Sequence, residues 1–319
     1  AAILGLIITY IILVKKQTIL AIPAGMLVRS AVSLIPNLVY LFILFFKNHI
    51  KMFNLRWVII KDYLLLTPNL LLSKLGTSVS GNIEPTLINM FLTPEIAVYF
   101  SVTKKAGELV KTIFDRVGGI LLPSMSHLFA QSKLETFREF CIKLINLLLP
   151  ISLLAFSVFI ILNKSFVDLW VGSENYLGNL MTILIALSLI ISYFSNTFSY
   201  LLSTVGDFRF PNIAVFFESM LKLALLYLLL KYLGLYGLPI AIMVTSGVFL
   251  VIYIWRWNRH LHLDSQQKRF IFKTTSKILI VLTIATIALF KIKDAITLDG
   301  FLEFLLFGAL VSITLVIIT

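Results

Sequence analysis

Long apolar segments alternate with short polar connections along most of the chain. Each segment meets or approaches the ~20 mainly apolar residues that a helix needs to cross a bilayer. Ten such segments cover residues 1–14, 18–46, 63–92, 95–122, 140–163, 177–204, 210–231, 235–255, 271–290 and 301–319. The longest connections, 47–62, 163–176 and 256–269, are too short to hold a soluble catalytic domain. The pattern predicts an all-α fold, a polytopic transmembrane helical bundle of about ten spans.

The composition supports the membrane interpretation. The chain is 59% hydrophobic and 13% charged, whereas a soluble domain is about half apolar and a quarter charged. A net charge of +12 is also typical of nucleic-acid-binding proteins, but the apolar content favours a lipid bilayer as the partner and no nucleic acid. Cys141 is the only cysteine, which excludes an intrachain disulfide and a thiolate metal cluster.

The distribution of Lys and Arg predicts the orientation of the spans. When alternate connections are grouped, the set with 47–62 and 256–269 holds eleven of these cations and the other set holds six. Cytoplasmic loops carry the excess of Lys and Arg, so the first set is predicted to face the cytoplasm. Both ends of the chain lie inside apolar segments, and we expect the chain to be a fragment of a longer protein.

One predicted span is strongly charged. The stretch VTKKAGELVKTIFDRVGG (102–119) places six charged residues on one side of a helix: Lys104, Lys105, Glu108, Lys111, Asp115 and Arg116. At about 100° per residue, the opposite side is apolar. A charge at the bilayer centre costs about 2.5–3.5 kcal/mol even on the lenient insertion scale, so this face must meet other helices or water.

Other predicted spans add buried charges. Arg29, Lys74, Glu84 and the pair Glu218 and Lys222 bring the total to seven cations and four anions, a net charge of +3 in the spans. Three acid–base pairs have i,i+4 spacing, which favours pairing on one helix: Lys104 with Glu108, Lys111 with Asp115, and Glu218 with Lys222. The pattern favours a wet cavity with a net positive wall, and Asn- and hydroxyl-rich segments at 73–82 and 192–200 suit an anionic, hydroxylated ligand. The alternatives for 102–119 are an amphipathic helix on the membrane surface and purely structural ion pairs.

No pattern indicates a cofactor, a metal site or an enzyme active site. HLHLD (260–264) offers two His and one Asp but lies in a basic loop without a further ligand nearby. Thr103, Ser124, Ser126 and His127 do not form a recognisable nucleophile arrangement. We therefore expect neither a metal nor a cofactor, and no catalytic residue.

Four segments together resemble a known family. They are GNIEPTLINMFLTPEIAVYFSVTKKAGELV (81–110), PSMSHLFAQ (123–131), LLSTVGDFRFPN (201–212) and GLYGLPIAIMVTSGV (234–248). In order and spacing they resemble spans seven to twelve of the polysaccharide-type (O-antigen or repeat-unit) flippases of the multidrug/oligosaccharidyl-lipid/polysaccharide exporter superfamily. Glu84 departs from the pattern, because the family more often has Asp there.

The resemblance implies a particular organisation. Residues 1–46 would be the last two spans of an N-terminal lobe, 47–62 a cytoplasmic linker between lobes, 63–260 a six-helix C-terminal lobe, and 261–319 two additional spans. These ten spans would match the fifth to the fourteenth of a fourteen-span, two-lobe exporter fold. Without the first four spans half the cavity is missing, so we expect this stretch alone not to transport.

The resemblance also implies a function. Such flippases move polyprenyl-pyrophosphate-linked oligosaccharides from the cytoplasmic to the outer leaflet by alternating access through a cationic central cavity, in bacterial or archaeal cytoplasmic membranes, with polysaccharide polymerase machinery as a further partner. The implied substrate-binding residues are Arg29, Lys74, Lys104, Lys105, Lys111 and Arg116. We hypothesise that Lys104 or Lys105 contacts the pyrophosphate together with Arg116.

The sequence leaves open the role of the acids in the spans and three other functions of the protein. Glu84, Glu108, Asp115 and Glu218 are candidates for ion coupling or for moderating anion binding. One alternative is a cation-coupled multidrug exporter of the same superfamily, which would place one or two lone carboxylates in a neutral cavity. The others are a membrane-embedded glycosyltransferase, ligase or polymerase, which usually needs a large outer loop, and a scaffold without a transport role.

Overall fold

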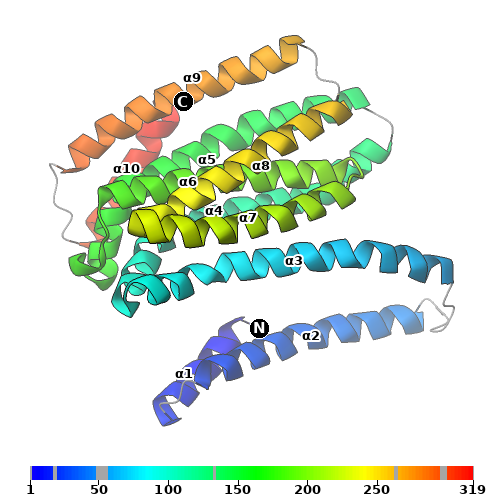
Figure 1. The fold of residues 1–319 in the computed structure, drawn as a ribbon, viewed down its shortest axis with the longest axis horizontal. Helices are drawn as coiled ribbons and strands as arrows, with labels where there is room; N and C mark the ends of the chain where they lie inside the picture. Colours follow the sequence, from blue (N-terminus) through cyan, green and yellow to red (C-terminus); the bar gives the residue numbers. More distant parts are fainter. Residues whose placement is uncertain are drawn as a thin grey trace. The chain divides into compact units, whose positions relative to one another are not determined.

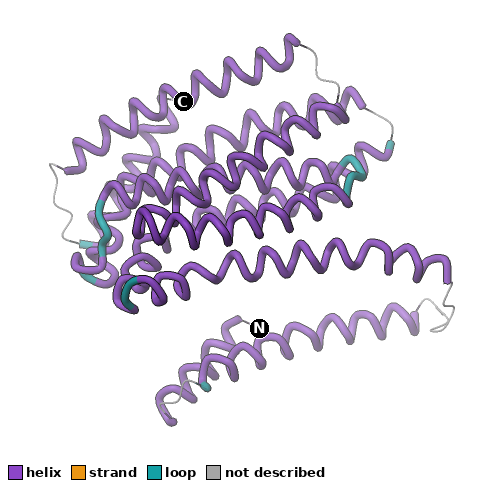
Figure 2. Tube along the Cα trace, viewed as in Figure 1, coloured by secondary structure: helices purple, strands orange, loops and turns teal. Residues whose placement is uncertain are grey.

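The computed structural model describes residues 2–16, 20–47, 57–131, 134–261, 265–294 and 300–318, and these ranges are almost entirely helical (Figure 2). The α-helices are α1 (Ala2–Lys16), α2 (Ala21–Lys47), α3 (Trp57–Phe91), α4 (Pro94–Ala130), α5 (Leu134–Val171), α6 (Asn179–Thr204), α7 (Arg209–Leu233), α8 (Gly237–Leu261), α9 (Ser265–Asp294) and α10 (Phe301–Ile318). Two short 3₁₀ turns, η1 (Ser173–Asn175) and η2 (Gly234–Tyr236), precede α6 and α8. Each predicted apolar segment corresponds to one α-helix (Figure 1), so the all-α prediction is confirmed for the described residues.

Several helices are long and apolar enough to cross a membrane. Within the described ranges, four such helical stretches are Pro23–Leu44, Glu135–Val171, Asn179–Thr204 and Arg209–Leu261. The last stretch contains both α7 and α8. Large apolar side chains such as Ile113, Ile120 and Val251 are exposed, as a lipid-facing surface requires. These features indicate a helical membrane protein, while the full set of about ten spans stays a prediction.

The helices extend further than the apolar segments. Residues 57–62, predicted as part of a connection, already belong to α3, and α5 continues through the predicted connection 163–176 as far as Val171. The connection predicted over 256–269 is helical up to Leu261 and again from Ser265. A helix keeps its internal hydrogen bonds beyond the apolar core of a bilayer, so charged residues at its ends do not stop it.

The chain divides into two compact units, Ala1–Leu65 and Leu66–Thr319. In the first unit α1 packs against α2. A Cβ atom added to Gly5 would lie 2.8 Å from the carbonyl oxygen of Gly25, so the two backbones approach closely at small residues, as membrane helices often do.

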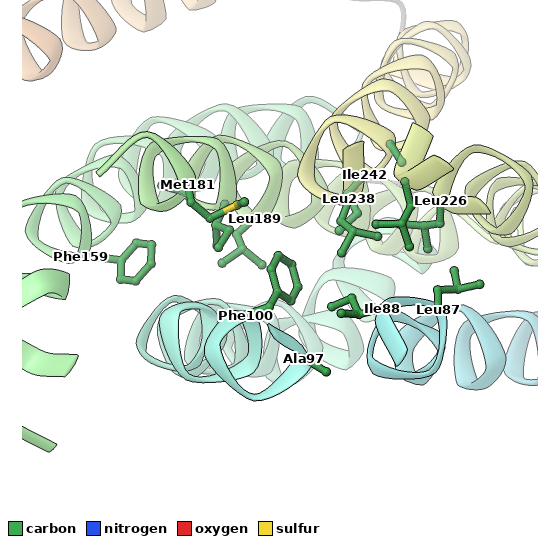
Figure 3. Packing of buried hydrophobic residues seen from close by; sticks show 14 of the residues in the cluster. Leu87, Ile88, Ala97, Phe100, Phe159, Met181, Leu189, Leu226, Leu238 and Ile242 are labelled. Atoms are coloured by element: carbon green, nitrogen blue, oxygen red, sulfur yellow. The ribbon is translucent and has the colours of Figure 1, made fainter. Parts of the chain in front are cut away.

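In the second unit α6 lies at the centre of the packing. It contacts α4, α5, α7 and α8, and α9 and α10 pack on α5. One buried apolar cluster joins Ile88 of α3, Phe100 of α4, Leu189 of α6 and Leu238 of α8 (Figure 3). This cluster fixes α3 and α4 against the other helices, and the charged face of α4 is built on it.

The turn between α6 and α7 is held to the end of α8 by Asp207. The carboxylate of Asp207 accepts hydrogen bonds from Nε of Arg256 at 2.9 Å and from the backbone N–H of Phe210 at 3.4 Å, and its Oδ2 lies 3.2 Å from Nε2 of His260. Burial alone would raise the pKa of the Asp207 carboxyl, but the hydrogen bonds with Arg256 and His260 outweigh burial and hold this pKa below its ordinary value of 3.8. This turn is predicted to face the cytoplasm.

Candidate functional site

Lys104 is the centre of the charged face of α4. Its Nζ atom lies 2.6 Å from Oε2 of Glu84 in α3 and 3.1 Å from Oε1 of Glu108, one turn along α4. The side chains of Lys104 and Glu84 are 11% and 5% exposed, whereas that of Glu108 is 42% exposed. One buried ammonium group is therefore shared by a carboxylate from each helix. The predicted pair of Lys104 and Glu108 is confirmed.

A tight turn between α3 and α4 brings Glu84 and Lys104 together. The backbone of Thr93 is extended, with φ −128° and ψ 159°, and Pro94 begins α4 directly afterwards. A residue before proline favours this extended conformation, and proline is well suited to the first position of a helix. Since two helices joined by a short turn run antiparallel, residues at similar distances from the turn face each other. Glu84 and Lys104 meet in this way.

Directly beside Lys104, α4 is fixed by a buried polar network around Thr103. The side-chain amide of Asn163 in α5 donates to the carbonyl of Thr103 at 2.9 Å and to the hydroxyl of Thr182 at 3.0 Å. The backbone N–H of Leu177 donates to the Thr103 hydroxyl at 3.2 Å. These bonds tie α4 to α5 and to the start of α6. They fix the backbone of α4 at the residue next to Lys104.

A pocket of about 220 Å³ lies beside the ion pair, between α3 and α4. Its lining consists of Gly81, Asn82, Glu84 and Pro85 from α3 and Phe100, Ser101, Lys104, Lys105 and Glu108 from α4. Glu84, Phe100 and Lys104 are buried and form the floor, while the other lining residues are exposed or half-buried and form the rim. The structure therefore brings four of the predicted site residues, Glu84, Lys104, Lys105 and Glu108, to one pocket.

A second ion pair lies further along α4. Nζ of Lys111 is 2.6 Å from Oδ2 of Asp115, which confirms the predicted i,i+4 pair. The side-chain amide of Asn196 in α6 donates to Oδ1 of Asp115 at 3.5 Å. Both side chains of the pair are partly buried, at 16% and 26% exposure. This pair extends the charged face along α4 and connects it to α6.

Two further charged residues predicted in the spans, Glu218 and Lys222, lie on α7. The carboxylate of Glu218 accepts hydrogen bonds from Ser246 at 2.9 Å and from Tyr253 at 3.5 Å, both on α8. Lys222 follows Glu218 by one helical turn on α7, but their predicted pair is not among the ion pairs of the described residues. Glu218 is instead bound by two side chains of α8.

The remaining predicted cations lie outside the pocket lining. Lys74 and Arg116 are exposed side chains of the second unit. Arg29 belongs to the first unit, where it is exposed and its carbonyl accepts a hydrogen bond from Ser33 at 2.9 Å. The pocket lining itself carries two lysines and two glutamates, so it is electrically balanced. The cationic central cavity implied by the resemblance stays a prediction.

Five pocket residues were not predicted as site residues from the sequence: Gly81, Asn82, Pro85, Phe100 and Ser101. Asn82 ends the polar segment 73–82, so its composition was a partial signal. Ser101 and Phe100 lie one turn before Lys105 and Lys104 on α4. Including the residues one turn before each predicted cation in the predicted site would have identified Phe100 and Ser101.

Comparison with known proteins gives no relative: no family model, no curated protein and no solved structure matches this chain.

Proposed function

We propose that the protein is a flippase that carries a polyprenyl-pyrophosphate-linked oligosaccharide from the cytoplasmic to the outer leaflet by alternating access, in a bacterial or archaeal cytoplasmic membrane. The single observation that carries the proposal is the charged face of α4, whose buried Lys104 borders a pocket within a helical membrane protein. Charges inside a membrane are costly to keep and usually mark a pathway for a polar or charged substrate. A wet, polar path fits a sugar-bearing headgroup.

The depth of the pocket is consistent with such a path. Glu84 precedes the end of α3 by seven residues, and Lys104 follows the start of α4 by ten. At 1.5 Å per residue, the pocket lies about 10–15 Å from the turn between the helices. The charge distribution predicts that this turn faces outward, and a bilayer core is about 30 Å thick. The pocket would then occupy the outer half of the membrane.

The exposed cations are the better candidates for the pyrophosphate. Lys104 already has two carboxylate partners, whereas Lys105 and Arg116 are exposed on the same helix. Phosphate groups bind Lys and Arg through charge-assisted hydrogen bonds. Lys105 and Arg116 are eleven residues apart, about 16 Å along the helix. We therefore assign them to successive positions of the headgroup along α4.

A translocation assay tests the proposal. The full-length natural protein, with any spans that precede or follow this sequence, is reconstituted in liposomes with a fluorescent polyprenyl-pyrophosphate oligosaccharide. The label that reaches the outer leaflet is quenched with membrane-impermeant dithionite. We expect transport by the wild type and at least roughly a tenfold loss in the double variant Lys105→Gln with Arg116→Gln, since two charge-assisted contacts are removed.

The matched control removes two exposed cations from another helix, with Lys143→Gln and Lys164→Gln in α5. It should transport at the wild-type rate. Equal rates in both double variants would refute the assignment of Lys105 and Arg116. Absence of transport by the wild type would refute the flippase itself.

A further inference from the structure

The pocket between α3 and α4 has no net charge to offer a ligand. Lys104 and Lys105 balance Glu84 and Glu108, and the Lys104 ammonium is already within 2.6 and 3.1 Å of the two carboxylates. A diphosphate entering this pocket would approach both glutamates, and an organic cation would approach both lysines. Neither gains a net Coulombic attraction from such a lining.

The rim offers hydrogen-bond acceptors and donors side by side. The amide of Asn82 donates to the Ser78 carbonyl at 2.8 Å, which leaves its oxygen and its second N–H. The Ser101 hydroxyl donates to the Ala97 carbonyl at 2.7 Å and keeps its lone pairs. Glu108 contributes its second carboxylate oxygen and Lys105 its ammonium group. A diphosphate only accepts hydrogen bonds at neutral pH, whereas a sugar hydroxyl both donates and accepts.

The volume matches one sugar ring. About 220 Å³ corresponds to the space of about seven water molecules. This is below the ~300–1,000 Å³ of pockets that enclose drug-sized ligands. A single pyranose fits such a space, while a whole oligosaccharide does not.

We propose that this pocket is a saccharide subsite: it takes one neutral or zwitterionic sugar ring of the cargo through Asn82, Ser101 and Glu108, and the pyrophosphate stays outside it. The inference rests on the proposed function, because it assigns one part of that cargo to this pocket. It also makes the floor pair of Glu84 and Lys104 a structural support for the subsite, with no direct anion-binding role.

Binding measurements on the purified natural protein test the subsite separately from transport. The probes are methyl glycosides of hexoses and of N-acetylhexosamines, farnesyl pyrophosphate as a headgroup without sugar, and tetraphenylphosphonium as an organic cation. We expect saturable glycoside binding, measured by saturation-transfer NMR. Asn82→Ala and Glu108→Gln should each weaken this binding about tenfold, the effect of one lost hydrogen bond. Farnesyl pyrophosphate binding should change less than about twofold.

A third variant adds bulk at the pocket rim and leaves the hydrogen-bonding groups in place. Gly81 lines the pocket and a Cβ atom there would meet nothing within 4 Å, so Gly81→Leu adds its side chain without a clash and should weaken glycoside binding. The matched controls are Gly119→Leu, which has equally open space outside the lining, and Asn212→Ala. Asn212 makes the same kind of bond as Asn82, to the Phe208 carbonyl at 2.7 Å. Both controls should bind glycosides like the wild type.

Three results of the binding measurements would overturn the subsite: no saturable glycoside binding by the wild type, a loss of farnesyl pyrophosphate binding as large as the loss of glycoside binding in the pocket variants, or displacement of the glycoside by tetraphenylphosphonium. Glycoside binding in a protein that does not translocate would support the subsite and refute the flippase. Translocation that survives Gly81→Leu unchanged would support the flippase and overturn the subsite.

Discussion

At the scale of single residues, the buried ammonium group of Lys104 determines how α3 and α4 hold together. Glu84 and Lys104 are both buried and lie twenty residues apart in sequence, and their contact of 2.6 Å joins α3 to α4. Removal of one partner of a buried ion pair leaves an uncompensated charge and costs about 3–5 kcal/mol. Glu108 still faces Lys104, so the lower end of this range applies here.

We therefore predict that Glu84→Gln lowers the free energy of unfolding by about 3 kcal/mol. The double variant Glu84→Gln with Lys104→Met should regain most of the loss, because it also removes the buried Lys104 charge that has lost its closer partner. Glu108→Gln is the control: its side chain is 42% exposed, so its loss should stay below about 1 kcal/mol. Denaturation in detergent micelles measures all three. A double variant less stable than Glu84→Gln alone would contradict the prediction.

The contacts of Asp207 with Arg256 and His260 give a pH-dependent prediction. The pKa of Asp207 is lower in the folded protein than its ordinary value of 3.8. The ionised carboxylate therefore stabilises the fold above about pH 4, and this contribution is lost as the pH falls through the folded-state pKa. Asp207→Asn should lower the melting temperature at pH 6, and the difference from the wild type should shrink at pH 3. Thermal scans at both pH values measure it.

The control for Asp207 is Glu139→Gln, which removes an exposed carboxylate 3.8 Å from Lys143. Exposed pairs of this kind contribute little to stability, so this variant should differ little from the wild type at either pH. A difference between wild type and Asp207→Asn that is as large at pH 3 as at pH 6 would show that the carboxylate charge is not what holds the turn.

Sequence spacing predicted the charge pairs within a helix but not the pairs between helices. The pairs of Lys104 with Glu108 and of Lys111 with Asp115 follow from helix geometry alone. The closer partner of Lys104, Glu84, could not be predicted because its position depends on where the chain turns and how α3 packs on the other helices. For the same reason, the hydrogen bonds that Ser246 and Tyr253 of α8 donate to Glu218 could not be predicted.

At the scale of elements, α4 is held against two neighbours at a glycine. A Cβ atom added to Gly107 would lie 2.7 Å from Leu189 of α6 and 2.9 Å from Phe159 of α5. We predict that Gly107→Ala overpacks this contact and destabilises the protein by about 1–3 kcal/mol. Gly119→Ala is the matched control on the same helix, because a Cβ atom there meets nothing within 4 Å and alanine favours helix by up to about 1 kcal/mol. Equal unfolding free energies for both variants would mean that α4 is not packed this closely.

The two faces of α4 were predicted, but the division of its apolar face was not. Phe114 is buried and its ring lies 5.5 Å from that of Tyr193 in α6, whereas Leu109, Ile113 and Ile120 are exposed. Periodicity separates polar from apolar residues. It does not say which apolar residues meet protein and which meet lipid, because both surroundings favour the same side chains.

At the scale of the whole molecule, the order of the α-helices in the described ranges could be predicted because each needs only a long apolar segment. The arrangement of α6 between α4, α5 and α8 could not, since lipid-facing and buried apolar segments have similar compositions. What the charge distribution does predict is the orientation across the membrane. In that orientation the turn between α3 and α4 and the turn η1 face outward, and the end of α4 faces the cytoplasm.

Cysteine labelling tests this orientation. Glu174 in η1 and Gln131 at the end of α4 are both exposed, and the natural Cys141 is fully buried, so the wild type is the background control. In intact cells, a membrane-impermeant maleimide should label Glu174→Cys and not Gln131→Cys, which should react only after permeabilisation. The opposite pattern would place the pocket in the cytoplasmic half of the bilayer. A sugar ring bound there would mark the loading end of the path.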